Sequence, residues 1–389
     1  MALVAAVGQA KMTHAREAGL QAAYQALNGL GNATPSLCLL IIPHRYAPGR
    51  VIEGVSSVLT NIPTLGLSVS ASLSQMGIHR HSVIAALLGG DDIHAQTHLF
   101  SAFRDNATAT ASLILQLAAF EQRPANGILV FGGGRSDKLE EFCNNLPAGL
   151  PLLGGLASGD PAGVNTFEIA GTQFSNDGLA AGILRGNFKI GVGYGHGWVP
   201  TDGYFNITAT EDFLIKQIDG MPILEKYSQL FGYSPQEWKS SPLNTLCRMY
   251  PPAIKQEGMQ GLRIMAPLAI EEDGSLRMNI LPAQGSTACI MVGSPDMCRQ
   301  SIHKSIKQAL QQLGGSKPVF AFILMDEAWH SLLQTQPDMV IQTIQEMIGK
   351  EIPIAGGYTL GQILPPEQPS SQCRFANQHI IITLFAEAN

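Results

Sequence analysis

Short apolar runs typical of β-strands alternate along the chain with amphipathic segments that have the period of an α-helix. Strand-like runs occupy residues 2–7, 37–42, 82–88, 128–131, 188–194, 204–210 and 379–385. A helix is expected from 13 to about 29, where small side chains form one stripe: Ala15, Ala18, Ala22 and Ala26. This alternation predicts a mixed α/β fold in which helices cover β-sheets.

A second helix is predicted after residue 293 from its start and stop signals. Ser294 is a good N-cap, and Pro295 suits the first helical position. Apolar residues then recur with helical spacing until Gly314, which is expected to end the helix.

An internal repeat joins an apolar strand, a helix and a proline-glycine turn. The three copies are LLIIP…RVIEGVSSVLTNIPTLG, ILVFGGG…KLEEFCNNLPAGLPLLGG and FAFILM…VIQTIQEMIGKEIPIAGG. The repeat predicts two pseudo-repeated lobes of mixed β-sheets covered by helices. Glycines after Pro151 and Pro353 permit positive φ or a close backbone approach at a strand end, where α/β folds place ligands, or they only turn the chain.

The position of the repeats suggests a division of the chain into two domains. Residues 1–220 contain two copies and 221–389 contain the third. A connecting helix followed by a proline-rich, irregular linker is expected over about 221–260.

The composition excludes several classes of protein. Charged residues make up 14% of the chain, below the usual share of about 25%, which favours an internal cavity or a face for self-association as a homo-oligomer. The net charge of −6 with no Lys/Arg block argues against nucleic acid as a partner. Six scattered cysteines and the lack of a long apolar segment predict reduced thiols in a cytoplasmic protein without a membrane span.

Several motifs together resemble the FIST family. GGLASGD at 154–160, NDGLAAGIL at 176–184 and the run GWVPTDGYFNITATEDFLIKQIDGMPILEKYSQLFG from Gly197 are similar to the FIST N-terminal module. DGSLRMNILPAQG and PIAGGYTLGQI at 353–363 are similar to the C-terminal module. The resemblance implies a sensory, non-enzymatic ligand-binding protein with two FIST modules. Stand-alone bacterial members of this size resemble nitric-oxide-sensing haem proteins. For this chain, the resemblance therefore implies haem b as the cofactor, nitric oxide as the ligand and a histidine kinase as the partner.

His196 is the residue that best suits an axial haem ligand. It follows a strand-like run and stands between two glycines, so little side-chain bulk opposes a planar ring. Tyr194 and Trp198 flank it and are expected to wall the pocket. His196 is therefore the predicted metal ligand, although a histidine at a strand end also suits a hydrogen-bonded surface role.

Other histidines compete for the same role. His44 follows the strand-like run LCLLIIP, and the adjacent Arg45 suits pairing with a propionate. His330 follows Trp329 at the end of another repeat strand and ranks third. His94 and His98 lie on one face of an expected strand and have no third ligand in the sequence.

An enzymatic role lacks a recognisable motif. Carboxylates near expected strand ends include Asp160, Asp177, Asp219 and Asp326, but turn and cap roles account for them and GxSxG is absent. The leading hypothesis is a haem-based nitric oxide sensor, and the alternative is a haem-free FIST module that senses a small metabolite such as an amino acid. A third hypothesis is a scaffold without a ligand.

Overall fold

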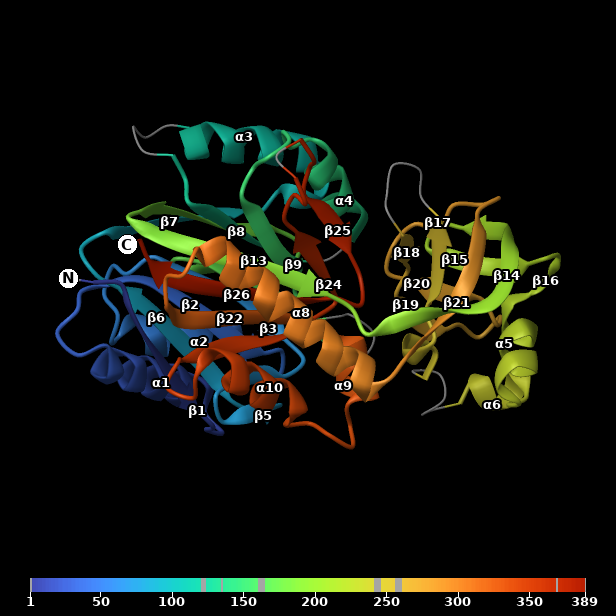
Figure 1. Ribbon diagram of the computed structural model, residues 1–389, viewed down its shortest axis with the longest axis horizontal. Helices are drawn as coiled ribbons and strands as arrows, with labels where there is room; N and C mark the ends of the chain where they lie inside the picture. The colour runs from blue at the N-terminus through green and yellow to red at the C-terminus, as the bar shows by residue number, and fades with distance from the viewer. Residues whose placement is uncertain are drawn as a thin grey trace.

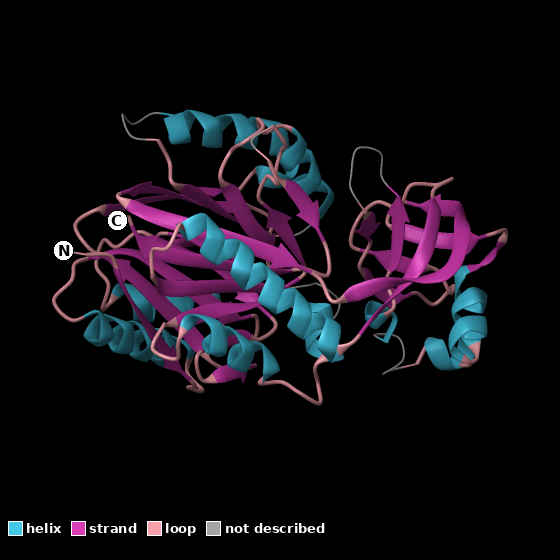
Figure 2. Ribbon diagram, in the orientation of Figure 1, coloured by secondary structure: helices cyan, strands magenta, loops and turns pink. Residues whose placement is uncertain are grey.

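The computed structural model describes residues 2–119, 124–133, 136–159, 165–240, 246–255, 261–368 and 370–388. It confirms the mixed α/β class predicted from the sequence. A large body with sheets inside and helices outside adjoins a smaller body rich in strands (Figures 1 and 2).

The large body consists of three lobes with the same order of elements. Lobe 1 (4–89) contains β1 (Val4–Ala10), α1 (Ala15–Leu30), β2 (Pro35–Pro43), α2 (Pro48–Ser56), β3 (Thr64–Val69), β4 (Ser72–Ser74), β5 (Gly77–His79) and β6 (Val83–Gly89). Lobe 2 (93–186) contains β7 (Ile93–Phe100), η1 (Phe103–Asp105), α3 (Ala107–Ala119), β8 (Gly127–Gly132), α4 (Ser136–Asn144), β9 (Leu152–Leu156), β10 (Glu168–Ala170), β11 (Gln173–Ser175) and β12 (Leu179–Gly186).

Lobe 3 is interrupted by the small body. It contains β13 (Phe188–Gly195), α8 (Pro295–Leu313), β22 (Pro318–Asp326), α9 (Glu327–Leu332), α10 (Met339–Ile348), β23 (Ile354–Thr359), β24 (Gly361–Leu364), β25 (Arg374–Ala376) and β26 (Ile380–Glu387). The insertion between β13 and α8 forms the small body (198–293). Its elements are β14 (Trp198–Glu211), β15 (Leu214–Ile218), β16 (Met221–Pro222), α5 (Ile223–Phe231), α6 (Pro235–Trp238), η2 (Cys247–Met249), β17 (Pro252–Lys255), β18 (Leu262–Ile264), β19 (Pro267–Ile270), β20 (Leu276–Met278) and β21 (Thr287–Gly293).

Each copy of the sequence repeat builds one parallel strand pair. The pairs are β2 with β3, β8 with β9, and β22 with β23. Two antiparallel strands complete each set of four, in the orders β1-β6-β2-β3, β7-β12-β8-β9 and β13-β26-β22-β23. The structure has three such lobes where the sequence analysis expected two, because each of the three repeat copies builds a lobe of its own.

The lobes exchange their short hairpins in a cycle. The hairpin β4-β5 of lobe 1 joins the sheet of lobe 3, β24-β25 of lobe 3 joins the sheet of lobe 2, and β10-β11 of lobe 2 joins the sheet of lobe 1. Every sheet thus has six strands, two of them from a neighbouring lobe.

The repeat glycines allow parallel strands to approach closely. A Cβ added at Gly66, Gly154 or Gly356 would lie 2.3, 1.7 or 1.9 Å from the carbonyl oxygen of the paired strand. None of the three has a positive φ. Close packing of the two backbones therefore explains Gly66, Gly154 and Gly356, the first repeat glycine of each lobe.

The three sheets enclose a shared apolar core. Leu39 of lobe 1, Phe131 of lobe 2 and Phe322 of lobe 3 belong to it, and the rings of Phe131 and Phe322 lie 6.0 Å apart. Alternate residues on the same strands face the outer helices, such as Leu40 toward α1 and α2. Burial on both faces explains why these strands appear as continuous apolar runs in the sequence.

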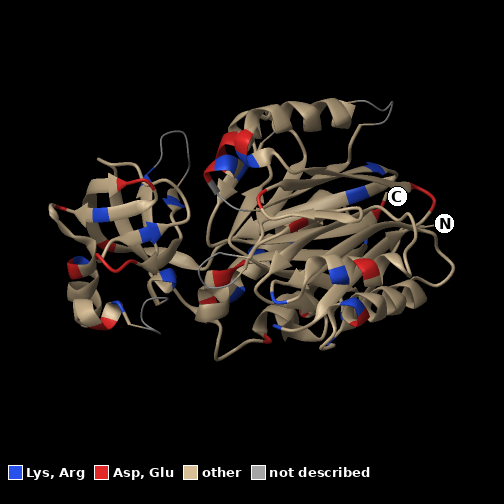
Figure 3. Cartoon of the chain, turned by 180° about the vertical axis from the view of Figure 1, so that it is seen from behind, with Lys and Arg blue, Asp and Glu red and all other residues tan. Residues whose placement is uncertain are grey.

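Charged residues of both signs are interspersed over the two bodies (Figure 3). In the parts of the chain described here, no helix is long and apolar enough to cross a membrane. The six cysteines are free and buried.

Candidate functional site

A cavity lies where the three lobes and the small body meet, which we call the junction cavity. Its volume is about 240 Å³. Its described lining residues are His44, Arg45, Ser70, Ala71 and Arg80 of lobe 1, Gly159 of lobe 2, Glu327, His330, Ser331 and Gln334 of lobe 3, and Arg248 of the small body. Because His44 and Glu327 directly follow β2 and β22, the cavity lies at the carboxyl ends of the parallel strands, a common place for ligands in α/β folds.

Glu327 connects three parts of the molecule at this cavity. Its carboxylate pairs with Arg248 of the small body at 2.9 Å and accepts a hydrogen bond of 2.6 Å from the Ser158 hydroxyl of lobe 2. The side chains of the pair are only 10% and 11% exposed, so the ion pair is largely shielded from water. Glu327 of lobe 3 therefore contacts both lobe 2 and the small body directly.

Basic side chains form another part of the cavity lining. The Arg80 guanidinium contacts Nε2 of His330, and the His330 ring packs 5.2 Å from the ring of Tyr358. Burial, followed by the charge of Arg80, lowers the pKa of His330. A neutral His330 accepts the hydrogen bond that Arg80 donates, which orients this guanidinium at the cavity.

Asp326 supports the acidic wall from within the core. It caps α9 by accepting a hydrogen bond from the backbone of Ala328, and it accepts another from the backbone of Gln378 at 2.9 Å. Burial is the main cause that raises the pKa of Asp326 to about 6.

The glycines around His196 have a packing role. Gly191, Gly193, Gly195 and Gly197 recur at every second position, so they share one face of the strand that leads into the small body. A Cβ at Gly193 would lie 1.7 Å from the carbonyl oxygen of Ser305, and one at Gly197 would lie 2.4 Å from Sγ of Cys298. The GVGYGHG sequence therefore admits close contact with helix α8.

His196 itself lines a second, larger hollow of about 580 Å³, which we call the lateral groove. Its Nδ1 accepts a hydrogen bond of 3.4 Å from the backbone N–H of Trp198, and its ring lies 5.0 Å from that of His379. Burial lowers the pKa of both histidines, and for His379 the neighbouring His196 lowers it further. Arg263 and Arg374 also line the groove.

The two aromatic neighbours of His196 take other places. Trp198 is 2% exposed, packs its ring 6.0 Å from that of Trp329 and donates a hydrogen bond from Nε1 to the carbonyl of Met249. It ties the small body to lobe 3 and does not line the groove. Tyr194 is half-buried beside His379, and burial together with Glu367 raises its pKa to about 12.

The predicted residues thus fall into two sites. His44, Arg45 and His330 come together at the junction cavity, and His196 lies in the lateral groove with Tyr194 nearby. Among the described residues, no group of three or more His, Cys, Asp or Glu side chains is arranged to hold a metal ion. Asp160 lies outside the described residues.

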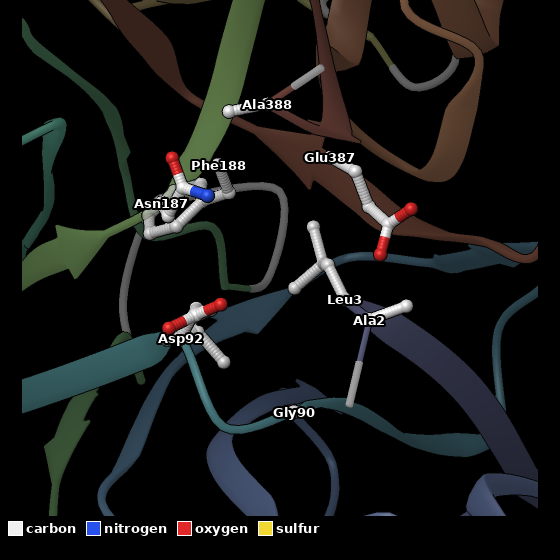
Figure 4. A pocket seen from close by; sticks show the side chains of 9 residues that line it. Ala2, Leu3, Gly90, Asp92, Asn187, Phe188, Glu387 and Ala388 are labelled. Carbon is white, nitrogen blue, oxygen red and sulfur yellow. The ribbon is translucent and has the colours of Figure 1, made fainter.

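A third cavity occupies the opposite end of the strands. It has a volume of about 120 Å³ and lies near both chain termini, between the start of β1, the end of β26 and the turns after β6 and β12 (Figure 4). Asp92 and Glu387 line it and no Lys or Arg does among the described residues. Of these two cavities, the junction cavity is therefore the one with arginine among its described lining residues.

Sequence reasoning missed Arg80, Ser158 and Arg248. Arg80 follows the hairpin β4-β5, which carries it across to lobe 3 beside His330. The hairpin exchange is not visible in the sequence, so no local signal identified these residues.

Comparison with protein families agrees with the motifs. A FIST N domain matches residues 36–221 and a FIST C domain matches residues 224–365. The chain is a FIST protein. FIST domains are sensory domains, which indicates a role in signalling. The two matched segments meet within the small body, so the family boundary does not separate the large body from the small one.

Individual relatives add little to the family assignment. An uncharacterized protein of Methanocaldococcus jannaschii is 30% identical over 83 residues, which cover 21% of this FIST chain and 16% of that protein. Phosphoribosylformylglycinamidine synthase II of Thermotoga maritima aligns over 99% of this chain and 72% of its own with 11% identity and a TM-score of 0.22. PurLQS of the same organism aligns over 100% and 73% with 10% identity and a TM-score of 0.23. Scores this low indicate neither a common fold nor a common function.

Proposed function

We propose that this FIST protein senses a small metabolite in the junction cavity and passes the signal to a separate output protein such as a histidine kinase. The observation that carries this proposal is the position of Glu327, which lines the cavity while it is bonded to Ser158 and Arg248. A ligand that contacts Glu327 therefore changes contacts of lobe 2, lobe 3 and the small body together. Differential binding of this kind shifts a population between conformations that a partner distinguishes.

We propose binding without catalysis at this site. Glu327 is held by Arg248 and Ser158, and His330 is held by Arg80, so these groups are occupied in positioning one another. A general acid or base must also reach the proton that it transfers and have a pKa near the working pH.

A thermal shift screen of the full chain with a metabolite panel that includes amino acids tests the proposal. A ligand at about 100 times its dissociation constant adds about 2.7 kcal/mol to stability. Ser331→Trp fills the cavity and should abolish the shift, whereas Ser112→Trp on the exposed face of α3 should preserve it. A panel that stabilises neither protein, or a shift unaffected by Ser331→Trp, contradicts binding in this cavity.

A haem-based nitric oxide sensor is the second candidate, favoured by the two imidazoles in the lateral groove. His196 and His379 use Nδ1 for hydrogen bonds within the chain, and Arg263 and Arg374 suit propionates. The walls fit less well, because many of them are polar side chains such as Glu140, Gln372 and Asn377, whereas a porphyrin face needs an apolar slot. The junction cavity therefore ranks first.

Absorbance spectroscopy tests this second candidate. Protein mixed with haem should show a Soret band that moves on addition of nitric oxide and that weakens strongly in His196→Ala. His14→Ala, at the exposed start of α1, serves as the control. Protein that stays colourless after reconstitution rules out haem.

A further inference from the structure

Building on the proposed metabolite site, we infer that the ligand of the junction cavity is a small organic dianion. Dicarboxylates and phosphate monoesters share this chemistry. Arginine recognises both, because its planar guanidinium donates two parallel hydrogen bonds to a carboxylate or a phosphate.

Two exposed guanidinium groups without an ion-pair partner among the described residues line the cavity. Arg45 and Arg80 line it, and neither forms an ion pair with any of the residues that the structure describes. Six other arginines do form such pairs, namely Arg50, Arg104, Arg248, Arg263, Arg277 and Arg374. Glu327, the carboxylate among the described lining residues, pairs with Arg248 and forms no ion pair with Arg45 or Arg80.

One of these guanidinium groups is held in place. Arg80 contacts His330, and the His330 ring packs against Tyr358, which is fully buried. An arginine oriented before binding loses less side-chain entropy when it receives an anion. Arg80 is therefore suited to fix one acidic group of the ligand.

The position of Arg45 indicates a second negative charge on the ligand. Arg45 also lines a neighbouring open hollow of about 480 Å³, together with Lys11 and His81. No Asp or Glu occurs among the described lining residues of that hollow. A ligand with two negative charges, on two carboxylates or on one phosphate, has a cationic partner in both Arg80 and Arg45, whereas a monoanion leaves one of them without an anion.

Isothermal titration calorimetry with the full chain tests the inference. Succinate and glycerol 3-phosphate are the dianionic probes, and succinamide and glycerol are their neutral counterparts. Binding of a dianion should weaken roughly ten- to hundredfold in Arg80→Gln and in Arg45→Gln, as expected for loss of a charge-assisted hydrogen bond. Arg50→Gln, which removes an exposed arginine paired with Glu53, should leave affinity unchanged.

Arg80→Lys separates recognition from folding. It retains the charge but not the paired donors, so its affinity should lie between those of the original protein and Arg80→Gln. Circular dichroism of each variant shows whether the fold is intact. Binding that is as strong in Arg80→Gln and Arg45→Gln as in Arg50→Gln overturns the inference.

The probes also distinguish this inference from the proposed function. If neutral or zwitterionic metabolites bind and Ser331→Trp blocks them, while dianions do not bind, the inference fails and the metabolite site stands. If no probe or metabolite binds, both fail. If succinate binds more tightly than glycerol 3-phosphate, the ligand carries carboxylates. The reverse order of affinities indicates a phosphate.

Discussion

Lobes 1 and 3 share one backbone plan but end their first parallel strands with opposite chemistry. At equivalent places in the two lobes, β2 ends in Pro43 and is followed by His44 and Arg45, whereas β22 ends in Asp326 and is followed by Glu327. The two ends face the same cavity. Lobes with the same strand order thus supply different side chains to one cavity, so the chemistry of the cavity resides in a few strand-end residues and not in the fold.

The largest expected effect concerns the acidic wall. Glu327→Gln removes the carboxylate that faces the buried Arg248, and loss of one partner of a buried ion pair costs about 3–5 kcal/mol. Chemical denaturation followed by circular dichroism measures this loss. Glu53→Gln, which breaks the exposed pair with Arg50 on α2 of lobe 1, should cost less than about 1 kcal/mol. Equal losses in the two variants would show that the junction pair is not shielded.

The second test compares the packing of α1 against β1 in lobe 1 with the packing of α8 against β13 in lobe 3. A Cβ at Gly193 of β13 would lie 1.7 Å from the carbonyl oxygen of Ser305, and one at Gly8 of β1 would lie 2.0 Å from that of Ala22. Gly193→Ala and Gly8→Ala should therefore each cost about 2–3 kcal/mol, measured as the free energy of unfolding. Gly203→Ala meets nothing within 4 Å and should change stability by less than about 0.5 kcal/mol. Tolerance of either of the first two changes would contradict the close helix contact.

The third test uses pH. Of the two strands compared, only β22 of lobe 3 ends in a titratable side chain, Asp326, whereas β2 of lobe 1 ends in Pro43. The pKa of Asp326 in the folded state, about 6, exceeds its ordinary value of 3.8. The folded protein therefore binds the proton of the Asp326 carboxyl more tightly than the unfolded chain does. The resulting stabilisation of the folded state is complete below about pH 4 and is lost as the pH rises through 6. The difference in stability between the original protein and Asp326→Asn should fall by roughly 2 kcal/mol across this range. A difference that stays constant from pH 4 to 7 would refute the raised pKa.

The smallest effect concerns helix caps. The Ser294 hydroxyl caps α8 by accepting the backbone N–H of Met297, whereas His14 makes no side-chain cap for α1. Ser294→Ala should destabilise the protein by about 1 kcal/mol, and His14→Ser should stabilise it by a similar amount. Melting temperatures of the two variants should shift in opposite directions. A shift in the same direction would mean that the caps do not differ as described.

Much of the secondary structure was predictable because its signals are local. The alanine stripe locates α1, and Ser294, Pro295 and Gly314 mark the two ends of α8, where Gly314 adopts the left-handed conformation. The apolar run at 37–42 lies within β2. In each case, neighbouring residues determine the outcome.

The candidate site was less predictable because its residues meet through long-range topology. Arg80 and His330 are brought into contact by the hairpin exchange, and Glu327 meets Arg248 only because the small body folds back on lobe 3. The glycines beside His196 were interpreted as room for a ligand, but they admit a helix that begins almost a hundred residues later in the chain. Local sequence gives no indication of which distant element will occupy such a space.

The cyclic hairpin exchange also constrains how the protein is made. During synthesis, lobe 1 emerges long before β23, yet its hairpin β4-β5 pairs with that strand. Strand edges of the growing chain stay open until β23 has been made, and such edges are prone to pair with other chains. Lobe 1 therefore cannot complete its strand pairing by itself, and a chain cut off before β23 should expose the edge of β4.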